Sequence, residues 1–487
     1  MQVTSQAFKA NAHKALGDDN LKTALFKLQH HFTNNRTRAV EALPEFERLR
    51  DRARDIKNEV LGALDFYLER FEQKVAEQGG TVHWCRTPRQ ARETILSLCR
   101  SVEAKTCTKG KSMIAEEIAL NPFLEENGVQ PIETDLGEYI IQLADEPPSH
   151  IIGPAVHKTL PQVADLFLEH HKRYGKTERQ TEPEALVGEA REILRQKYLD
   201  ADVGITGANF LVAETGSTII VTNEGNGDLT QMLPKMHIVV ASIEKIVPTL
   251  EDLSTILRVL ARSATGQEFS VYTTLSTGAR QSADLDGPGA FHVVLLDNGR
   301  SEMIGTELQE LLRCIRCGAC MNSCPVYHAV GGHAYGWVYP GPIGAALDPK
   351  FIGLEAGQHL PNASPLCGKC ESVCPMRIPL PKIFRYWRDK AFEEKITPLP
   401  QRAGIGVWAW FARRPELYRL ASRLGIGVLG RLGRKAGKFR SLPLASGWTE
   451  GRDLPAPEGR TFHDLWQERR GRRGPPKSGD PFRKLFS

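Results

Sequence analysis

The stretch Cys314–Pro325, "CIRCGACMNSCP", carries four cysteines with the spacing C-x2-C-x2-C-x3-C-P. In runs of this spacing, three close thiolates bind one iron–sulfur cluster, and the fourth, carried away by the turn at the proline, binds a second cluster. Zinc sites usually use two separated C-x2-C pairs and need neither a third close cysteine nor a C-P ending. The run therefore predicts iron–sulfur clusters, with structural zinc as the competing interpretation.

A second cysteine run, "LCGKCESVCP", spans Leu366–Pro375 and repeats the pattern with one cysteine fewer. By the same crossed rule, its last cysteine returns to complete the first cluster. Ser364 stands where a full repeat would carry the eighth cysteine. The predicted ligands are Cys314, Cys317, Cys320 and Cys374 for cluster one, and Cys324, Cys367 and Cys370 for cluster two.

Three explanations for the missing eighth thiolate stay open. The second cluster could be a three-iron cluster that needs only three cysteines, a four-iron cluster with Ser364 or another non-cysteine ligand, or a site completed by solvent or a partner. We therefore expect two iron–sulfur clusters, 4Fe-4S for the first and 4Fe-4S or 3Fe-4S for the second. A site-differentiated iron in the second cluster could bind substrate, but an electron relay with altered potential is the expected role.

The overall composition is that of a globular protein, and we expect the chain to be cytoplasmic. The 487 residues, 41% hydrophobic and 25% charged with a net charge of +5, suit about two to four domains. Met1–Ala10 lacks the features of a signal peptide, and no uncharged apolar run reaches about eighteen residues. In this compartment thiols stay reduced, so ten cysteines favour metal binding over disulfides. Cys85, Cys99 and Cys107 lack paired spacing and are expected to be buried core residues.

Hydrophobic patterning divides the chain into four segments. Residues 1–78 form a helical arm, with helical spacing from Arg38 to Gln78 as one long helix or two joined near Pro44. Residues 79–301 alternate strands and helices, which predicts an α/β domain with a parallel sheet. Residues 302–394 form an α-helical, ferredoxin-like two-cluster iron–sulfur domain, and residues 395–487 a helical, basic C-terminal region with a flexible tail. The expected early strands are "TVHWC", the first part of "KTCTKGKS", which runs into a loop, "VQPIETD" and "SHIIGPAV".

Nucleotide-binding motifs do not occur in the chain. There is no G-x-G-x-x-G between a strand and a helix, and "TKGKS" at Thr108–Ser112 lacks the first glycine of a phosphate-binding loop. We therefore expect no NAD or flavin site. The chain is predicted to move single electrons between a donor and an acceptor on other chains.

The two cysteine runs and their surroundings resemble the iron–sulfur subunit of bacterial lactate-utilisation systems, the LutB type. The resemblance extends to "GGHAYG" (Gly331–Gly336), "YPGPIG" (Tyr339–Gly344) and "GITGANFLVAETGSTIIVTNEGNG" (Gly204–Gly227), which is similar to the signature of the LUD domain. The basic, Trp-containing C-terminal region also resembles that of the family. The resemblance thus covers nearly the whole chain.

This resemblance implies a function and a set of partners. The chain would be a non-autonomous oxidoreductase subunit that transfers electrons in a complex oxidising L-lactate to pyruvate, together with a cysteine-rich subunit and a second LUD-domain subunit. The LUD domain would be similar to the sugar-phosphate isomerase and CoA-transferase superfamily (NagB/RpiA/CoA-transferase-like). Seven cysteines would be the usual complement of the family.

Polar residues at predicted strand ends of the LUD domain are candidates for ligand binding, because open α/β sheets bind ligands there. A carboxylate would need a cation, which Lys109, Lys111 or Lys158 could supply. No catalytic base can be named, and turn formation explains the same polar residues. His328, His333 and His359 flank the clusters and are expected to pack or to tune a relay. The strand-end candidates are Asn209, Glu214, Thr215, Gly216, Ser217, Asn223, Glu224 and Asn226.

The C-terminal region places apolar residues among arginines between Gly404 and Phe439. Such a segment could lie at the inner face of an anionic membrane near a quinone-linked acceptor, but burial against protein is the preferred interpretation. The basic run Arg469–Lys484 is expected to be solvated surface. Alternative functions are electron transfer for another 2-hydroxy acid, or small-molecule or nucleic-acid binding with a structural metal; nucleic acid is the weaker expectation. The apolar residues are Trp408, Trp410, Phe411, Leu417, Leu420, Leu424 and Leu429.

Overall fold

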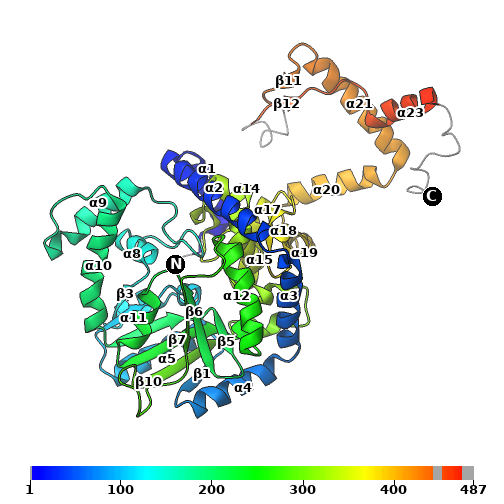
Figure 1. Ribbon diagram of the computed structural model, residues 1–487. Helices are drawn as coiled ribbons and strands as arrows, with labels where there is room; N and C mark the ends of the chain where they lie inside the picture. The colour runs from blue at the N-terminus through cyan, green and yellow to red at the C-terminus, as the bar shows by residue number, and fades with distance from the viewer. Residues whose placement is uncertain (1–2, 443–451, 474–487) are drawn as a thin grey trace. The chain divides into compact units, whose positions relative to one another are not determined.

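The computed structural model describes residues 3–442 and 452–473, and the chain forms two compact units, Met1–Glu393 and Glu394–Ser487 (Figure 1). A six-stranded parallel sheet lies in the first unit, with the strand order β1-β10-β7-β4-β2-β3. The register pairs Val203 with both Cys107 and Met236. The strands are β1 (Thr81–Cys85), β2 (Thr106–Lys109), β3 (Gln130–Glu133), β4 (Val203–Gly207), β7 (Met236–Ser242) and β10 (Ala290–Leu296).

Both faces of this sheet are buried, which explains the continuous apolar runs of its central strands. Val240 and Val294 point to a core shared with α5, α6 and α7, whereas Val239 and Val293 point to a core shared with α4 and a second sheet. That second sheet has the order β8-β5-β6-β9. Its strands are β5 (Phe210–Val212), β6 (Ser217–Thr222), β8 (Ile246–Val247) and β9 (Tyr272–Ser276).

The helices of this α/β part begin with regular caps where the sequence offers them. The Thr87 side chain accepts a hydrogen bond from the Gln90 amide at the start of α5, and Thr249 does the same for Asp252 in α12. Helices α8, α9 and α10 share a separate apolar cluster around Tyr139 and Phe167. The helices are α5 (Pro88–Ser101), α6 (Met113–Glu117), α7 (Leu120–Glu126), α8 (Leu136–Leu143), α9 (Leu160–His171), α10 (Pro183–Asp200), α11 (Asn226–Met232) and α12 (Leu250–Ala264).

One predicted strand is wrong. The segment Ser149–Val156, "SHIIGPAV", is irregular. Its local hydrogen bonds compete with strand pairing, because His150 Nδ1 accepts from the amides of Ile152 and Gly153, both at 3.2 Å. Pro154 has no amide hydrogen to donate to a neighbouring strand.

The N-terminal helices are more numerous than the sequence predicts. The expected helix or pair of helices over residues 38–78 is broken both near Pro44 and at Ala63, whose φ of −146° leaves the helical range. Helices α2 and α3 pack on α12 and on the cysteine-containing segment. The elements are α1 (Phe8–Leu16), α2 (Asp19–Glu41), α3 (Phe46–Gly62) and α4 (Leu64–Glu77).

The cysteine-containing segment is built from short helices around one large apolar core that also takes in α2, α3 and α12. Tyr327 and Phe384 are among its fully buried side chains. The helices are α13 (Ala319–Asn322), α14 (Pro325–Val330), α15 (Gly341–Phe351), α16 (Leu354–Gly357), α17 (His359–Ala363), α18 (Lys369–Val373) and α19 (Leu380–Glu393).

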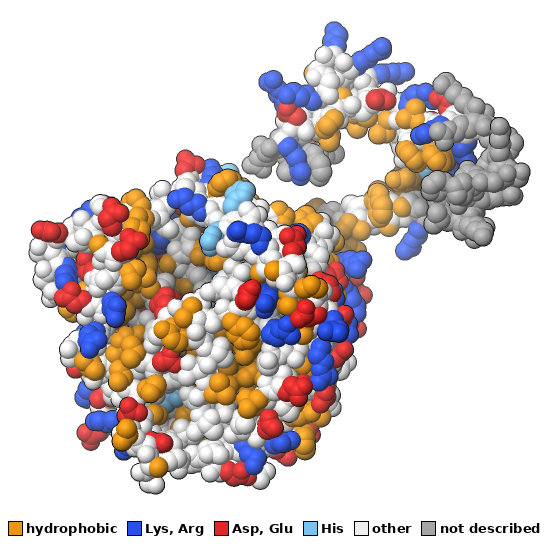
Figure 2. All heavy atoms as spheres, viewed as in Figure 1, with side chains coloured by type: hydrophobic (Ala, Val, Ile, Leu, Met, Phe, Trp, Pro, Cys, Tyr) orange, Lys and Arg blue, Asp and Glu red, His pale blue; other side chains and the backbone are white. Residues whose placement is uncertain are grey.

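The second unit carries apolar and basic side chains side by side on its helices (Figure 2). Trp408 and Trp410 are 62% and 48% exposed, so they are not buried within this unit. Residues 474–484 of the basic run lie outside the described residues. Among the described helices, none is both long and apolar enough to span a membrane. The elements are α20 (Leu399–Ala412), α21 (Pro415–Gly433), β11 (Lys438–Phe439), β12 (Leu454–Pro455) and α23 (Phe462–Arg473).

Candidate functional site

The seven cysteines of the two runs lie in two neighbouring sets. In the first set, Cys317 and Cys320 each lie close enough to Cys314 and Cys374 to interact with them electrostatically. In the second set, Cys370 interacts in the same way with Cys324 and Cys367. Cys320 also interacts with Cys370, so the two sets are adjacent. The structure thus brings together the members of each predicted ligand set, and the binding of iron stays a prediction.

The two cysteine runs share one backbone conformation. Cys314 has φ −65° and ψ 120°, and Ser364 has φ −71° and ψ 129°. Ser364 also lines a small cavity together with Cys324, Cys367 and Cys370. Ser364 therefore occupies the position that the eighth cysteine would take. The following residues repeat the match with φ values of 57° and 54° at Arg316 and Leu366, and 72° and 78° at Gly318 and Gly368.

The donor set fits iron–sulfur clusters. Burial raises the pKa of Cys370 to about 12 and raises the pKa of Cys317 and Cys320 as well, with neighbouring thiols adding to the effect. Such thiols stay protonated unless a positive centre binds them, because clustered thiolates in a buried site repel one another. Cys85, Cys99 and Cys107 lie apart from both sets, buried in the core around the parallel sheet.

Cations from the N-terminal helices surround the first set. Arg50 of α3 donates to the Cys374 carbonyl from Nε at 3.1 Å and from Nη2 at 2.6 Å. Arg36 of α2 donates to the Val373 carbonyl at 3.1 Å. At the second set, Arg388 of α19 donates to the Ser364 carbonyl at 2.6 Å. Such contacts orient cluster ligands and raise the reduction potential of a cluster.

A cavity of about 280 Å³ lies at the carboxyl edge of the parallel sheet. Its lining comes from the ends of β2, β4 and β7, from β6, from α12 and from Arg316 of the first cysteine run. Ligands of α/β sheets bind at this edge because the loops that follow the strands meet there. The cavity therefore joins the sheet to the loop that carries Cys314 and Cys317.

The polar groups of this cavity include charges without a full set of partners. The Lys245 ammonium makes no hydrogen bond or ion pair with any described residue. Burial lowers its pKa to about 8. Arg316 is 9% exposed, with Nη2 at 3.6 Å from Glu244 Oε1. Glu244 also faces Arg300, which forms a buried ion pair with Glu117 at 2.6 Å.

Four of the eight strand-end candidates line this cavity, namely Asn209, Asn223, Glu224 and Asn226. The other four do not line it: Glu214, Thr215 and Gly216 form the β5–β6 turn, and Ser217 begins β6.

Of the three predicted cations, only Lys111 lines the cavity, where it donates to the Ile152 carbonyl at 2.8 Å. Lys109 is wrong as a ligand-binding cation, because it is fully buried between Glu133 at 2.8 Å and Glu116 at 3.2 Å. Lys158 lies elsewhere, paired with Glu146. Lys245 and Arg316 are not among the predicted site residues. The position of Lys245, three residues after the end of the buried strand β7, is the one sequence signal that could have indicated it.

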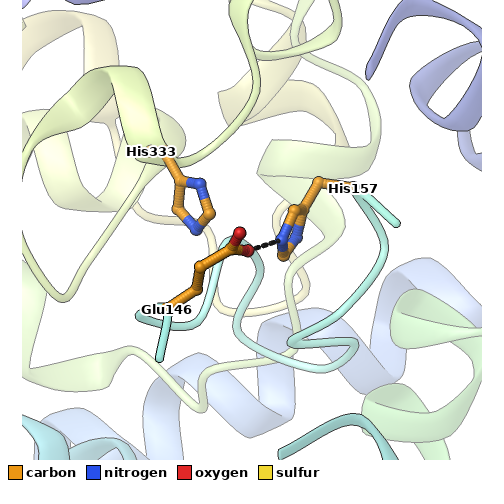
Figure 3. Close-up of side chains that lie close together, drawn as sticks. All are labelled: Glu146, His157 and His333. Atoms are coloured by element: carbon orange, nitrogen blue, oxygen red, sulfur yellow. Dashed lines mark hydrogen bonds and ion pairs between the residues drawn. The ribbon is translucent and has the colours of Figure 1, made fainter. Parts of the chain in front are cut away.

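The three predicted histidines make local contacts. His333 lies beside His157 and Glu146, with a hydrogen bond of 2.7 Å between the last two (Figure 3). Lys158 and the backbone already hold this group: Lys158 Nζ lies 2.5 Å from Glu146, and His333 Nε2 lies 2.8 Å from the Pro147 carbonyl. A metal would have to displace these partners.

The other two histidines also show no sign of acting as cluster ligands. His328 Nε2 lies 2.8 Å from the Asn322 carbonyl, which ties it to the backbone between Cys320 and Cys324. His359 begins α17, and burial lowers its pKa.

Comparisons with known families match most of the chain, in three parts. The LUD domain matches residues 68–296, the 4Fe-4S dicluster domain residues 310–378, and the C-terminal domain of lactate utilisation protein B residues 397–471. A solved structure of a DUF162 family protein from Deinococcus radiodurans covers 48% of this chain and 98% of its own, at 14% identity and a TM-score of 0.28.

Curated relatives match from end to end. Lactate utilization protein B of Bacillus velezensis is 41% identical, over 97% of this chain and 99% of that protein. The protein of the same name in Geobacillus kaustophilus is 41% identical, over 99% of both chains. An uncharacterized electron transport protein of Escherichia coli, YkgF, is 40% identical, over 96% of this chain and 98% of that protein. Since this identity extends over nearly the full length of each relative, the chain belongs to the lactate utilization protein B family.

Proposed function

We propose that this chain is the iron–sulfur electron-transfer subunit of a complex that oxidises L-lactate to pyruvate. The observation that carries the proposal is the pair of adjacent thiol sets, one of four cysteines and one of three, in a chain whose full-length relatives are named for lactate utilisation. The chain would be a non-autonomous oxidoreductase subunit, working with a cysteine-rich subunit and a second LUD-domain subunit.

The first cluster would be a 4Fe-4S cluster held by Cys314, Cys317, Cys320 and Cys374. The second would be held by Cys324, Cys367 and Cys370, with the Ser364 side chain at the fourth position, either as an oxygen ligand of a 4Fe-4S cluster or beside the open corner of a 3Fe-4S cluster. The shared backbone conformation of Cys314 and Ser364 supports this position. When bound, such clusters accept and release one electron at a time.

The order of the two sets supports an electron path through the chain. The cavity reaches the loop of the first set at Arg316, Cys320 interacts with Cys370 of the second set, and Cys367 of the second set is exposed. Electrons would enter at the first cluster and leave at the second, where a partner can approach. The finer fold relationship to the CoA-transferase superfamily and a peripheral place at the inner membrane face are further parts of this proposal.

Anaerobic purification tests the proposal through iron and sulfide content and electron paramagnetic resonance before and after dithionite. About eight iron atoms, with signals appearing on reduction, would support two 4Fe-4S relays, and about seven, with a signal in the oxidised protein, would support a 3Fe-4S second cluster. A colourless protein that contains zinc would contradict the proposal.

A further inference from the structure

We propose that the cavity at the carboxyl edge of the parallel sheet binds a small 2-hydroxy carboxylate, with Lys245 and Arg316 as its cationic partners. The inference rests on the proposed function, because it places the substrate of that reaction in this chain, beside the first cluster. It is carried by three groups that line one cavity and lack partners: an ammonium, a guanidinium nitrogen and an amide oxygen.

The first group is the Lys245 ammonium. Lys245 ends the short helix that follows β7, and Lys57 Nζ fixes the backbone on both sides by donating to the carbonyls of Glu244 and Ile246. Lys245 itself makes no hydrogen bond or ion pair within the described part of the chain. Glu244 attracts this charge but forms no ion pair with it and is shared with Arg300 and Arg316, so a bound carboxylate would stabilise the partly buried ammonium.

The second group belongs to Arg316. This residue lies between Cys314 and Cys317 and has a φ of 57°, a backbone conformation that residues other than Gly, Asn and Asp rarely adopt. Its guanidinium lies over the Tyr339 ring at 4.7 Å, yet Nη1 is buried without a partner among the described residues. The equivalent Leu366 of the second run has nearly the same φ, 54°, so this conformation belongs to the cysteine loop, and the unpaired buried donor is the feature of Arg316 that points to a ligand.

The third group selects the hydroxyl. Asn226 begins α11, is 8% exposed, and its Oδ1 has no partner within the described residues. An unpaired amide oxygen accepts a hydrogen bond, and the hydroxyl of a 2-hydroxy acid can donate one. Lys111, the other lining lysine, is already held by the Ile152 carbonyl and lies 3.7 Å from Asp135. Lys245 has no ion pair within the described residues, and Arg316 has only the 3.6 Å contact with Glu244, so these two are the lining cations best able to bind a carboxylate.

A simpler role for the same cations is to neutralise the thiolates of the first cluster, because Cys314 interacts with both Lys245 and Arg316. The two roles predict different results. Neutralisation alone predicts a changed cluster in a Lys245 variant and no binding of carboxylates. A ligand site predicts binding that depends on the charge at residue 245 in a protein whose clusters are intact.

The test is equilibrium dialysis of the full-length, cluster-containing chain with labelled L-lactate, in the dithionite-reduced state so that no oxidation occurs. Lys245→Met should weaken L-lactate binding about tenfold to a hundredfold, the usual effect of losing a hydrogen bond to a charged group, and Lys245→Arg should retain most of it. The control is Lys158→Met, which removes a lysine paired with Glu146 outside the cavity and should leave binding unchanged. Propionate, which lacks the hydroxyl, should bind about tenfold more weakly than L-lactate.

Iron content and the resonance signal of the first cluster are measured on the same samples. If Lys245→Met loses its clusters, the Asn226→Asp variant is used in its place. It puts a negative charge into the cavity from α11, which lies outside the cysteine runs. A normal L-lactate affinity in that variant overturns the inference. Equal affinities of Lys245→Met and the unmodified chain, or no L-lactate binding by a chain with normal clusters, also overturn it and leave the electron relay standing. A chain without iron contradicts the proposed function instead.

Discussion

The buried carboxylate of Glu244 connects the sheet to the cysteine loop, and replacing it by Gln tests how the site is held. Glu244 is 3% exposed, with Oε2 at 3.0 Å from Arg300 Nε and Oε1 at 3.6 Å from Arg316 Nη2. Glu244→Gln removes the charge with little change of shape. It leaves Arg300 with its second partner Glu117, but leaves the Arg316 charge without a carboxylate.

Two estimates of the cost agree. Burial alone would raise the pKa of Glu244, but Arg300 and Arg316 overcome it and hold the pKa at about 2, against an ordinary value of 4.5. At about 1.4 kcal/mol per pH unit, this difference corresponds to about 3 kcal/mol at pH 7. Breaking a buried ion pair from one side costs about 3–5 kcal/mol. Because the folded-state pKa is the lower one, this stabilisation is complete above about pH 5 and is lost as the pH falls toward 2.

The assay is the rate of anaerobic unfolding in urea at pH 7, because cluster loss makes unfolding irreversible. Glu244→Gln should raise this rate by about tenfold to a hundredfold, depending on how much of the interaction survives in the transition state. The matched control is Glu302→Gln, which breaks an exposed ion pair with Lys350 at 2.6 Å and should change the rate less than about threefold. Equal rates in the two variants would refute the assignment of Glu244 as a structural counter-ion.

Four further variants test the cluster ligands and the cations beside them. Cys374→Ser should remove the signal of the first cluster and spare the second, and loss of only the second signal would show that the crossed ligation is wrong. Ser364→Cys should supply a fourth thiolate and change the spectrum or iron content of the second cluster; an unchanged spectrum would count against Ser364 at the vacant position. Arg50→Met removes a buried cation and its hydrogen bonds to the Cys374 carbonyl, so it should lower the reduction potential of the first cluster in a redox titration. The same titration of Arg388→Met should lower the potential of the second cluster and leave the first unchanged.

Much of the architecture follows from local sequence signals. Buried parallel strands such as β7, "MHIVVAS", can be predicted because they are continuous apolar runs, and the expected parallel sheet is present. The segment Ser149–Val156 has the same apolar character but is not a strand, because His150 and Pro154 give its backbone other hydrogen-bonding partners. The break at Ala63 directly follows Gly62, a local signal for a helix end that lies within the continuous apolar periodicity. Apolar periodicity alone therefore indicates neither the irregular backbone of Ser149–Val156 nor this break.

The part of the site that could be predicted is the part whose residues have a characteristic spacing along the sequence. The cysteine spacing identifies both thiol sets, and the repeat identifies Ser364 as the position without a cysteine. The charges of the cavity could not be found in this way, because each lysine looks alike in the sequence. Lys109 follows the same strand-end rule as Lys245, yet Glu133 and Glu116 surround it, whereas Lys245 has no such partner among the described residues. Partners distant in sequence decide which lysine is free to bind a ligand.

The tripeptide Cys314-Ile315-Arg316 joins the two halves of the site. Its first residue contributes a thiol to the first set, and its last lines the cavity, so a ligand in the cavity lies close to the first cluster and farther from the second. The cations around the first set, Arg50 and Arg36, favour its reduction, which suits a cluster that takes electrons from a bound donor. The second set has the exposed Cys367, which suits release of electrons to a partner. A carboxylate that binds as proposed must therefore perturb the signal of the first cluster more than that of the second, whatever the nuclearity of the second cluster proves to be.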